Sequence, residues 1–241
     1  MEPSNSSLFV YLADSYQNTG LDSLGDASAR CTDMMNLLSS EKWHRDLICE
    51  ARATKEAIIS SYQEMINLTD RGNWLLFYFL GHGMQDIAFQ TPNNIGNIQS
   101  YLVTFDASLQ TGIENWKFKN DKFFCDNDLM NVTEQAFEKG LYVCNILDCC
   151  YGGGMNEILP ATQGSNLQVF FAAAQPGVAV QLSADGSTEF YRNLYSAASA
   201  VSVYQDLENK LLAGKESVAQ EKMPYTIVPD SLLGVKTVFK I

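Results

Sequence analysis

The stretch Phe77-Tyr78-Phe79-Leu80-Gly81-His82-Gly83 decides the fold class, because an apolar run of strand length leads directly into a histidine between glycines. A second stretch, Asn145-Ile146-Leu147-Asp148-Cys149-Cys150-Tyr151-Gly152-Gly153, leads in the same way into a thiol. Parallel α/β sheets present reactive side chains like this at the carboxyl ends of their strands. The two stretches therefore predict a cysteine nucleophile with a general base. The other histidine, His44, lies in a polar stretch and is the rival base.

Length and composition favour one globular domain with a large core, since 46% of the 241 residues are apolar and no linker or internal repeat divides them. The net charge of -12 disfavours nucleic acid or an anionic membrane surface as a partner, because either would need a cationic face. The first seven residues contain no basic residue, and the apolar run from Leu8 to Ala13 is too short for a signal peptide or a membrane span. These features predict a cytoplasmic protein.

Cysteine spacing points away from metal and disulfide frameworks, because no CxxC motif joins the cysteines at 31, 49, 125, 144, 149 and 150. The first four lie among apolar or helical neighbours, and we expect them to fill the core. Only Cys149 and Cys150 stand where a strand turns into glycine.

Apolar runs of strand length alternate with segments of helical period, which predicts a mainly parallel sheet with helices on both faces. We expect strands at 8–13, 47–49, 74–80, 101–105, 141–147, 168–174 and 235–241. We expect helices at 25–38, from Thr54 to 66, from Asp126 or Asn127 to 137, at 188–200 and at 203–212, with the named residues as N-caps.

Taken together, the motifs resemble those of the caspase and metacaspase group of cysteine peptidases, over nearly the whole chain. Metacaspases have Ser-Gly-His-Gly and Asp-Ser-Cys-His-Ser-Gly after apolar strands, where this chain has Leu80–Gly83 and Asp148–Gly153. His82 and Cys150 lie 68 residues apart, more than the roughly 50 of animal caspases, and the Gln-Ala-Cys signature is missing. The metacaspase or bacterial caspase-like branch therefore fits better.

This resemblance implies the fold: a caspase-like three-layer αβα sandwich, α/β in class, around a mostly parallel sheet of roughly six strands. It implies a single peptidase domain over residues 1–241, with a part like the caspase large subunit at 1–150 and a part like the small subunit at 165–241.

The resemblance also implies the catalytic groups. Cys150 would be the nucleophile and His82 its base, with the backbone N–H groups of Gly83 and Cys150 as the oxyanion hole. A free thiol, with a pKa near ~8.5, is mostly protonated at neutral pH, and a nearby imidazole supplies the thiolate. One fixed amide stabilises the negative oxygen by about 3 kcal/mol in comparable sites. This chemistry needs no cofactor.

Two residues depart from the family pattern. Cys149 replaces a serine, and Tyr151 replaces a histidine. Successive side chains of an extended segment point to opposite faces, so only one thiol should face His82, and the alignment favours Cys150. A catalytically silent scaffold and a Cys149–Cys150 redox switch are the alternatives to a working peptidase.

Asp148 matches the metacaspase acid in the substrate pocket, which implies an endopeptidase that cleaves after Lys or Arg. A second pocket residue should come from the first long helix. Arg30 there would neutralise Asp148 or favour an acidic substrate residue, as in an Asp-directed protease. Asp33 would instead reinforce the basic preference. A solvated helix face is the alternative for both residues.

Many metacaspases need calcium as an activator, and Asp126, Asp128 and Glu157 match their site, with Asp106 as a weaker addition. Asp126 and Asp128 could instead be charges that favour a helix start.

The implied partners are protein or peptide substrates and either an activating protein or a homodimer formed through residues 235–241. The implied setting is cell death or defence signalling. No lysine or arginine lies between Lys139 and Arg192, so self-cleavage at a basic residue just after the nucleophile is excluded. Lys117, Lys119 and Lys122 are the expected basic cleavage sites.

Overall fold

The computed structural model describes residues 4–13, 16, 19–38, 43–85, 99–112, 115–118, 122–156, 168–180, 187–201, 203–212, 225–228, 232 and 239. For residues 109–112, 115–118, 156 and 225 it describes the backbone alone.

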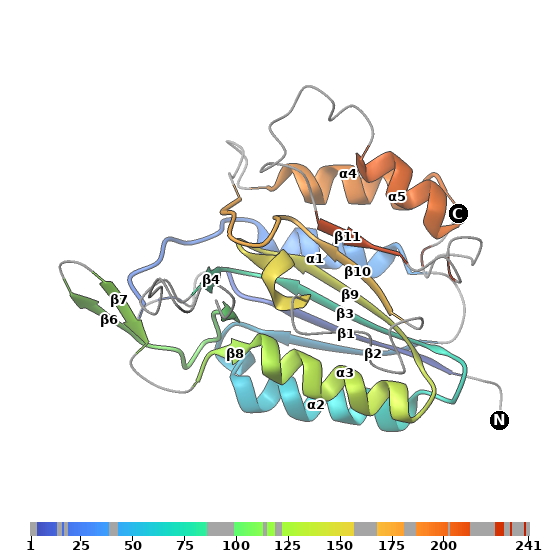
Figure 1. The fold of residues 1–241 in the computed structure, drawn as a ribbon, viewed down its shortest axis with the longest axis horizontal. Helices are drawn as coiled ribbons and strands as arrows, with labels where there is room; N and C mark the ends of the chain where they lie inside the picture. The colour runs from blue at the N-terminus through green and yellow to red at the C-terminus, as the bar shows by residue number, and fades with distance from the viewer. Residues whose placement is uncertain are drawn as a thin grey trace, which may run out of the picture.

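A six-stranded sheet forms the centre of the molecule, in the order β11-β10-β9-β3-β1-β2 (Figure 1). Five strands are parallel, and β11 is antiparallel to β10. Their bounds are β1 Asn5–Tyr11, β2 Trp43–Cys49, β3 Trp74–Leu80, β9 Tyr142–Asp148, β10 Gln168–Ala172 and β11 Tyr225–Ile227. The predicted fold class, a mostly parallel six-stranded α/β sandwich, is confirmed.

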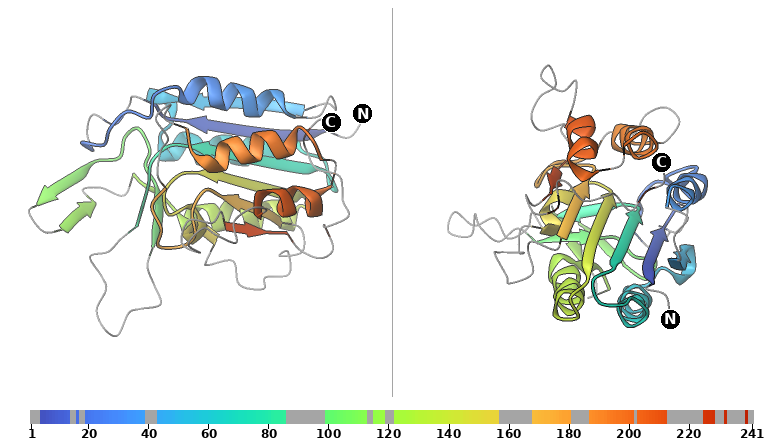
Figure 2. Two further views of the ribbon diagram at one scale, coloured as in Figure 1. Left: turned by 90° about the horizontal axis from the view of Figure 1, so that it is seen from above. Right: turned by 90° about the vertical axis from the view of Figure 1, so that its right-hand side faces the viewer.

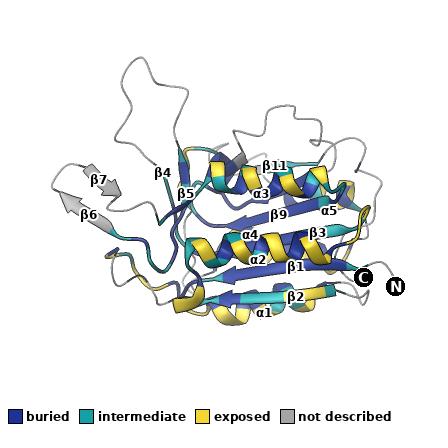
Figure 3. Cartoon of the chain, turned by 90° about the horizontal axis from the view of Figure 1, so that it is seen from below, coloured by how far each residue is buried: buried dark blue, intermediate teal, exposed yellow. Residues whose placement is uncertain are grey.

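Helices cover both faces of this sheet (Figure 2). The α2 helix (Lys55–Leu68) and the α3 helix (Asp126–Glu138) pack on one face. On the other face lie α1 (Ala27–Asn36), α4 (Glu189–Ala198) and α5 (Tyr204–Leu212). Figure 3 shows the strands buried between helices whose outer sides are exposed.

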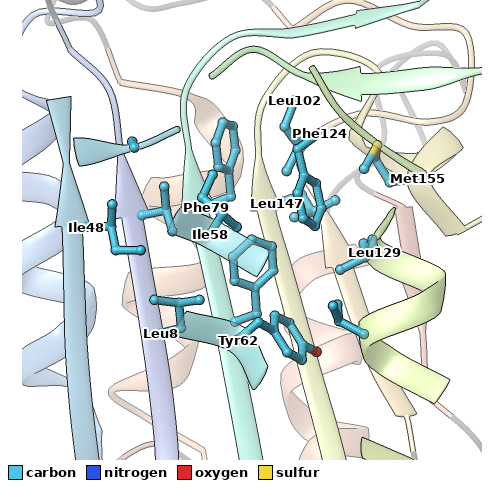
Figure 4. Packing of buried hydrophobic residues seen from close by; sticks show 14 of the residues in the cluster. Leu8, Ile48, Ile58, Tyr62, Phe79, Leu102, Phe124, Leu129, Leu147 and Met155 are labelled. Carbon is cyan, nitrogen blue, oxygen red and sulfur yellow. The ribbon is translucent and has the colours of Figure 1, made fainter. Parts of the chain in front are cut away.

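Strands β3 and β9 are mainly apolar, without alternation, because both of their faces are covered. In β3, Leu75, Phe77 and Phe79 pack towards α2 and α3, and the residues between them pack towards α1 and α4. Figure 4 shows Phe79 and Leu147 of the two strands in the first of these cores, together with Tyr62 of α2. The parallel register pairs Leu80 with Asp148. The two motifs of the sequence therefore leave the sheet side by side.

The N-caps of three helices can be compared with the sequence. One was predicted, one was not named in advance, and one differs from the prediction. Thr54 caps α2, because its Oγ1 accepts a hydrogen bond from the N–H of Ala57 at 3.2 Å. Thr188 caps α4 in the same way. The N-cap of α3 is Cys125, so the expectation of Asp126 or Asn127 is wrong by one or two residues. The helix starts early because the side chain of Asp128 accepts from the N–H of Cys125 at 2.8 Å.

One expected strand joins another sheet, and a second cannot be compared with the described residues. The stretch expected at 101–105 forms β5 (Ser100–Leu102), which pairs with β4 (Gly83–Gln85) and β8 (Phe124–Cys125) in a separate three-stranded sheet. A hairpin of β6 (Leu109–Gly112) and β7 (Asn115–Phe118) follows it. The short β11 is the sixth strand of the central sheet. The expected strand 235–241 lies outside the described residues except for Phe239, which forms an isolated bridge with Leu38.

All six cysteines are free thiols. Cys31 and Cys144 are buried in the core as expected, whereas Cys49 and Cys125 are only half-buried. Among the described helices, none has the length and apolar content that a membrane crossing requires.

Candidate active site

A pocket of about 90 Å³ opens at the carboxyl edge of β3 and β9. His82 and Cys150 both line it, because the register of the two strands brings their ends together. His44 lies on the edge strand β2, with an exposed side chain, and does not belong to the pocket. The pocket is lined by Leu24, Arg30, Leu80, Gly81, His82, Asp148, Cys149, Cys150, Val180 and Thr188.

The imidazole of His82 is held in one orientation by the backbone. Its Nε2 lies 2.8 Å from the carbonyl oxygen of Asp22. A carbonyl can only accept, so Nε2 carries the proton in this contact, and the neutral ring keeps Nδ1 as its acceptor. Burial lowers the pKa of His82 and so favours the neutral ring that a general base needs.

Tyr16 holds the backbone of the same residue. Its hydroxyl accepts from the N–H of His82 at 3.0 Å and donates to the carbonyl of Leu12 at 3.1 Å. The Tyr16 ring also meets the imidazole edge-on, with 4.6 Å between centroids. Sequence reasoning missed Tyr16 and Asp22. The Asp22 contact uses the main chain, so no side-chain motif in the sequence indicates it.

The two adjacent thiols differ in environment. Cys150 is half-buried in the pocket, where its Sγ accepts from the N–H of Val180 at 3.3 Å. Cys149 is only 3% exposed and packs in the core that faces α2 and α3. Burial raises the pKa of both thiols, and that of Cys149 well above the ordinary value. Cys150 is therefore the thiol placed for chemistry.

A sharp turn follows Cys150. Tyr151 has a φ of 57°, in the left-handed region, and its N–H donates to the carbonyl of Val178 at 2.8 Å. The chain then enters a 3₁₀ turn at Gly152–Asn156. This turn carries the backbone away from the sheet and leaves Cys150 at its edge.

Gly83 lies directly against the nucleophile segment. A Cβ at this position would collide with the backbone carbonyl oxygen of Cys150 and would lie 3.2 Å from the Sγ of Cys149. Glycine is thus required for the close approach of two backbones here.

Asp148 is buried beside the two thiols, with 3% of its surface exposed. It accepts from the hydroxyl of Thr188 at 2.7 Å and from that of Tyr78 at 3.5 Å. Burial raises the pKa of Asp148 to about 6. Because Thr188 also caps α4, this carboxyl group ties α4 to the pocket.

Of the two candidates on α1, Arg30 lines the pocket and Asp33 does not. Arg30 is only 7% exposed, so the alternative of a solvated helix face is wrong for this residue. Its Nη2 donates to the carbonyl of Leu24 at 2.9 Å, and its guanidinium lies 6.0 Å from the ring centroid of Tyr191. Asp33 accepts from the hydroxyl of Tyr191 at 3.0 Å.

The carboxylates expected to hold calcium serve the start of α3. Asp126 accepts from the N–H groups of Ser100 and Asn127. Asp128 caps Cys125 and forms an ion pair with Lys55, 2.7 Å from its Nζ. In the described part of the chain, no three His, Cys, Asp or Glu side chains are grouped as metal ligands. Both oxygens of Asp126 and the Oδ2 of Asp128 are therefore bound by other groups in this structure.

The other two expected calcium ligands are Glu157 and Asp106. Glu157 lies outside the described residues. Asp106 lies beside Lys122, with 4.0 Å between their charged atoms.

The fold and site together define a caspase-like α/β protein with a cysteine and a histidine at the carboxyl edge of its sheet. The model of the family described as metacaspase, peptidase C14 domain matches residues 24–159, which include both side chains. The chain belongs to this family and is a cysteine peptidase, a hydrolase that acts on proteins or peptides.

Solved structures share this fold at low sequence identity. A protein of Geobacter sulfurreducens is 11% identical with a TM-score of 0.68, and the match covers 99% of each chain. Caspase-1 from Spodoptera frugiperda is 13% identical with a TM-score of 0.56, over 94% of this chain and 86% of that one. A search of curated protein sequences finds no match.

Proposed function

We propose that the chain is an endopeptidase in which Cys150 is the nucleophile and His82 the general base. The observation that carries this proposal is the shared pocket, in which the backbone carbonyl of Asp22 holds Nε2 of His82 and leaves Nδ1 to accept a proton. Neutral forms of both groups are favoured by burial, so the thiolate forms when the proton is transferred.

The reaction then follows from these two groups. The Sγ of Cys150 gives its proton to Nδ1 of His82 and attacks the carbonyl carbon of the scissile peptide. The negative oxygen accepts hydrogen bonds from the N–H groups of Gly83 and Cys150. When the C–N bond breaks, the imidazolium gives its proton to the leaving amine and a thioester remains. Water, deprotonated by His82, hydrolyses that thioester and restores the thiol.

The family likeness implies cleavage after Lys or Arg. Asp148 supports it, because a carboxylate in the pocket attracts a basic side chain. The cation of Arg30 in the same pocket opposes it. Calcium activation, proposed from the family likeness, would require Asp128 to exchange Lys55 for the ion.

A second candidate function is a catalytically silent scaffold or regulator. The contact between the N–H of Val180 and the Sγ of Cys150 favours it, because a backbone group covers the atom that must attack. An activating partner protein or a second copy of the chain would have to move this segment away.

The test is turnover of fluorogenic peptides by the wild type and three variants. We expect Cys150→Ala and His82→Ala to lose turnover by at least about a thousandfold, because removing either group of such a unit costs most of the rate. Cys149→Ala should stay within a few-fold of the wild type. The dyad is wrong if Cys149→Ala alone abolishes turnover. Failure of Cys150 to react with a covalent thiol inhibitor would favour the silent scaffold.

A further inference from the structure

The pocket that holds the catalytic pair also holds a buried cation. Among the residues that line it, Arg30 alone is a lysine or arginine. We propose that this pocket receives an acidic side chain of the substrate, the one before the scissile bond, and that Arg30 recognises its carboxylate. The proposal rests on the function proposed above and names the substrate class of the same site.

The guanidinium of Arg30 is held in place before any substrate arrives. Its Nη2 donates to the carbonyl of Leu24, and the N–H of Leu24 is itself bound to the carbonyl of Ala13 at 2.9 Å. The ring of Tyr191 lies against the guanidinium, and its hydroxyl is bound to Asp33. A cation fixed in this way loses little freedom when a ligand binds.

Among the described residues, part of this guanidinium has no partner. The Nε of Arg30 is buried, and no described residue accepts a hydrogen bond from it. A buried donor without an acceptor is unfavourable, and a ligand that supplies the acceptor gains from it. The acceptor that best matches the planar fork of an arginine is a carboxylate, which can take two parallel hydrogen bonds.

The charge of Arg30 lowers the pKa of Asp148, but Asp148 supplies no hydrogen-bond acceptor to the guanidinium. No direct ion pair joins the two side chains, both of which belong to the described part of the chain. The oxygens of Asp148 are instead bound by the hydroxyls of Thr188 and Tyr78. A lysine or arginine of a substrate would enter beside the fixed cation, where the surrounding protein screens repulsion poorly.

The experiment uses five peptidyl chloromethyl ketones that differ only in the residue next to the ketone: Asp, Glu, Gln, Lys or Arg. The Sγ of Cys150 displaces chloride and forms a C–S bond, so the rate of adduct formation, followed by intact mass, measures selection without turnover. The wild type is compared with Arg30→Gln, Asp148→Asn and, as a matched control, Arg45→Gln, which lies exposed on the edge strand β2.

We expect an acidic reagent, Asp or Glu, to react at least about tenfold faster than Lys or Arg reagents with the wild type and with Arg45→Gln. Arg30→Gln should lose this preference, and its cooperative urea unfolding shows that it is folded. Asp148→Asn should increase the preference, because it removes the one carboxylate that repels the ligand. Equal or faster reaction of Lys or Arg reagents, or an acidic preference that survives in Arg30→Gln, would overturn the proposal.

If the proposed pair of Cys150 and His82 is wrong, the same reagents give a different result. Iodoacetamide, which has no side chain for the pocket, reports the thiol alone. If adducts form on Cys149, or if His82→Ala reacts with every ketone as fast as the wild type, the catalytic pair is wrong. If adducts form on Cys150 without acidic preference, the dyad stands and the assignment of Arg30 fails.

Discussion

The Nε2 of His82 lies 2.8 Å from the backbone carbonyl oxygen of Asp22. Two residues later in the same segment, the carbonyl of Leu24 accepts from Arg30 at 2.9 Å. One short stretch after β1 therefore orients both His82 and the buried Arg30 of the pocket. Because it does so with main-chain atoms, substitutions of its side chains can leave both contacts intact.

The hydroxyl of Tyr16 is the other support of His82, and its removal should be measurable. In Tyr16→Phe the N–H of His82 loses its buried acceptor, which costs about 1–3 kcal/mol of unfolding free energy. The imidazole also loses its fixed position, so turnover should fall about tenfold or more. Urea unfolding and peptide turnover check the two effects. Tyr195→Phe, at an exposed tyrosine, is the control and should change neither. Unchanged turnover in Tyr16→Phe would show that the Asp22 carbonyl alone orients the ring.

The pH dependence of Cys150 follows from its burial. Since the pKa of this thiol is raised and that of His82 is lowered, the resting site holds a neutral pair. Alkylation of Cys150 by iodoacetamide should therefore rise with pH to a midpoint above the ~8.5 of a free thiol. Mass spectrometry after proteolysis separates Cys150 from the other cysteines, with Cys150→Ala as the blank. A rate that is already at its plateau between pH 5 and 6 would instead reveal a thiolate–imidazolium pair.

Gly83 should tolerate no side chain. In Gly83→Ala the new methyl group would meet the carbonyl of Cys150, a backbone atom that cannot turn aside. We expect turnover to fall by at least about a hundredfold, because the displaced nucleophile leaves its near-attack position. The comparison is Gly20→Ala, where the φ of 70° is unfavourable for alanine but no atom lies within 4 Å of the new methyl group. That variant should lose about 1 kcal/mol of stability and keep its turnover. Equal activity losses in both would point to general destabilisation.

Much of the fold could be predicted from the sequence, because β3 and β9 lie in the middle of the sheet. Apart from Asn145 and Asp148 of β9, their residues are apolar, which is typical of strands covered on both faces. Their ends carry the histidine and the cysteine, so the two side chains that line the pocket were predicted together with the fold. The N-cap threonine of α2 was equally visible, since its side chain makes the contact.

The errors fall where pairing partners decide the structure. β5 and β11 are three residues long, and nothing within so short a run shows whether it joins the central sheet. For β5, the turn after His82 decides, because Gly83 begins β4 and pairs with Leu102. The roles of Arg30 and Asp33 could not be separated either, because both lie on α1 and only the orientation of that helix selects one for the pocket.

Asp148 should make stability depend on pH. Its pKa in the folded protein, about 6, exceeds the ordinary ~3.9, so the folded state holds the proton more tightly than the unfolded state. The stabilisation from the protonated form is present below about pH 4 and is lost as the pH rises to 6. Asp148→Asn keeps an acceptor for Thr188 and carries no charge. Relative to the variant, the wild type should lose about 2 kcal/mol of unfolding free energy between pH 4 and 7.

Urea unfolding across this range measures that difference. Thr188→Val provides the companion experiment, because it removes the hydroxyl that lowers the pKa of Asp148. This variant should be less stable at every pH, because α4 loses its cap. Its pH-dependent loss of stability should occur at higher pH than in the wild type. A difference between wild type and Asp148→Asn that stays constant from pH 4 to 7 would contradict this account of the buried carboxyl group.

Calcium, if Asp126 and Asp128 bind it, must compete with Lys55. The Nζ of Lys55 lies 2.7 Å from Asp128, so a positive charge already stands where the ion would bind. In Lys55→Ala the carboxylate becomes available, and calcium should activate turnover at a concentration several-fold lower than in the wild type. Lys210→Ala, at an exposed position of α5, is the matched control and should respond as the wild type does. Calcium activation with the same midpoint in all three proteins would place the ion elsewhere, whereas turnover that ignores calcium throughout would leave these acids with the single role of starting α3.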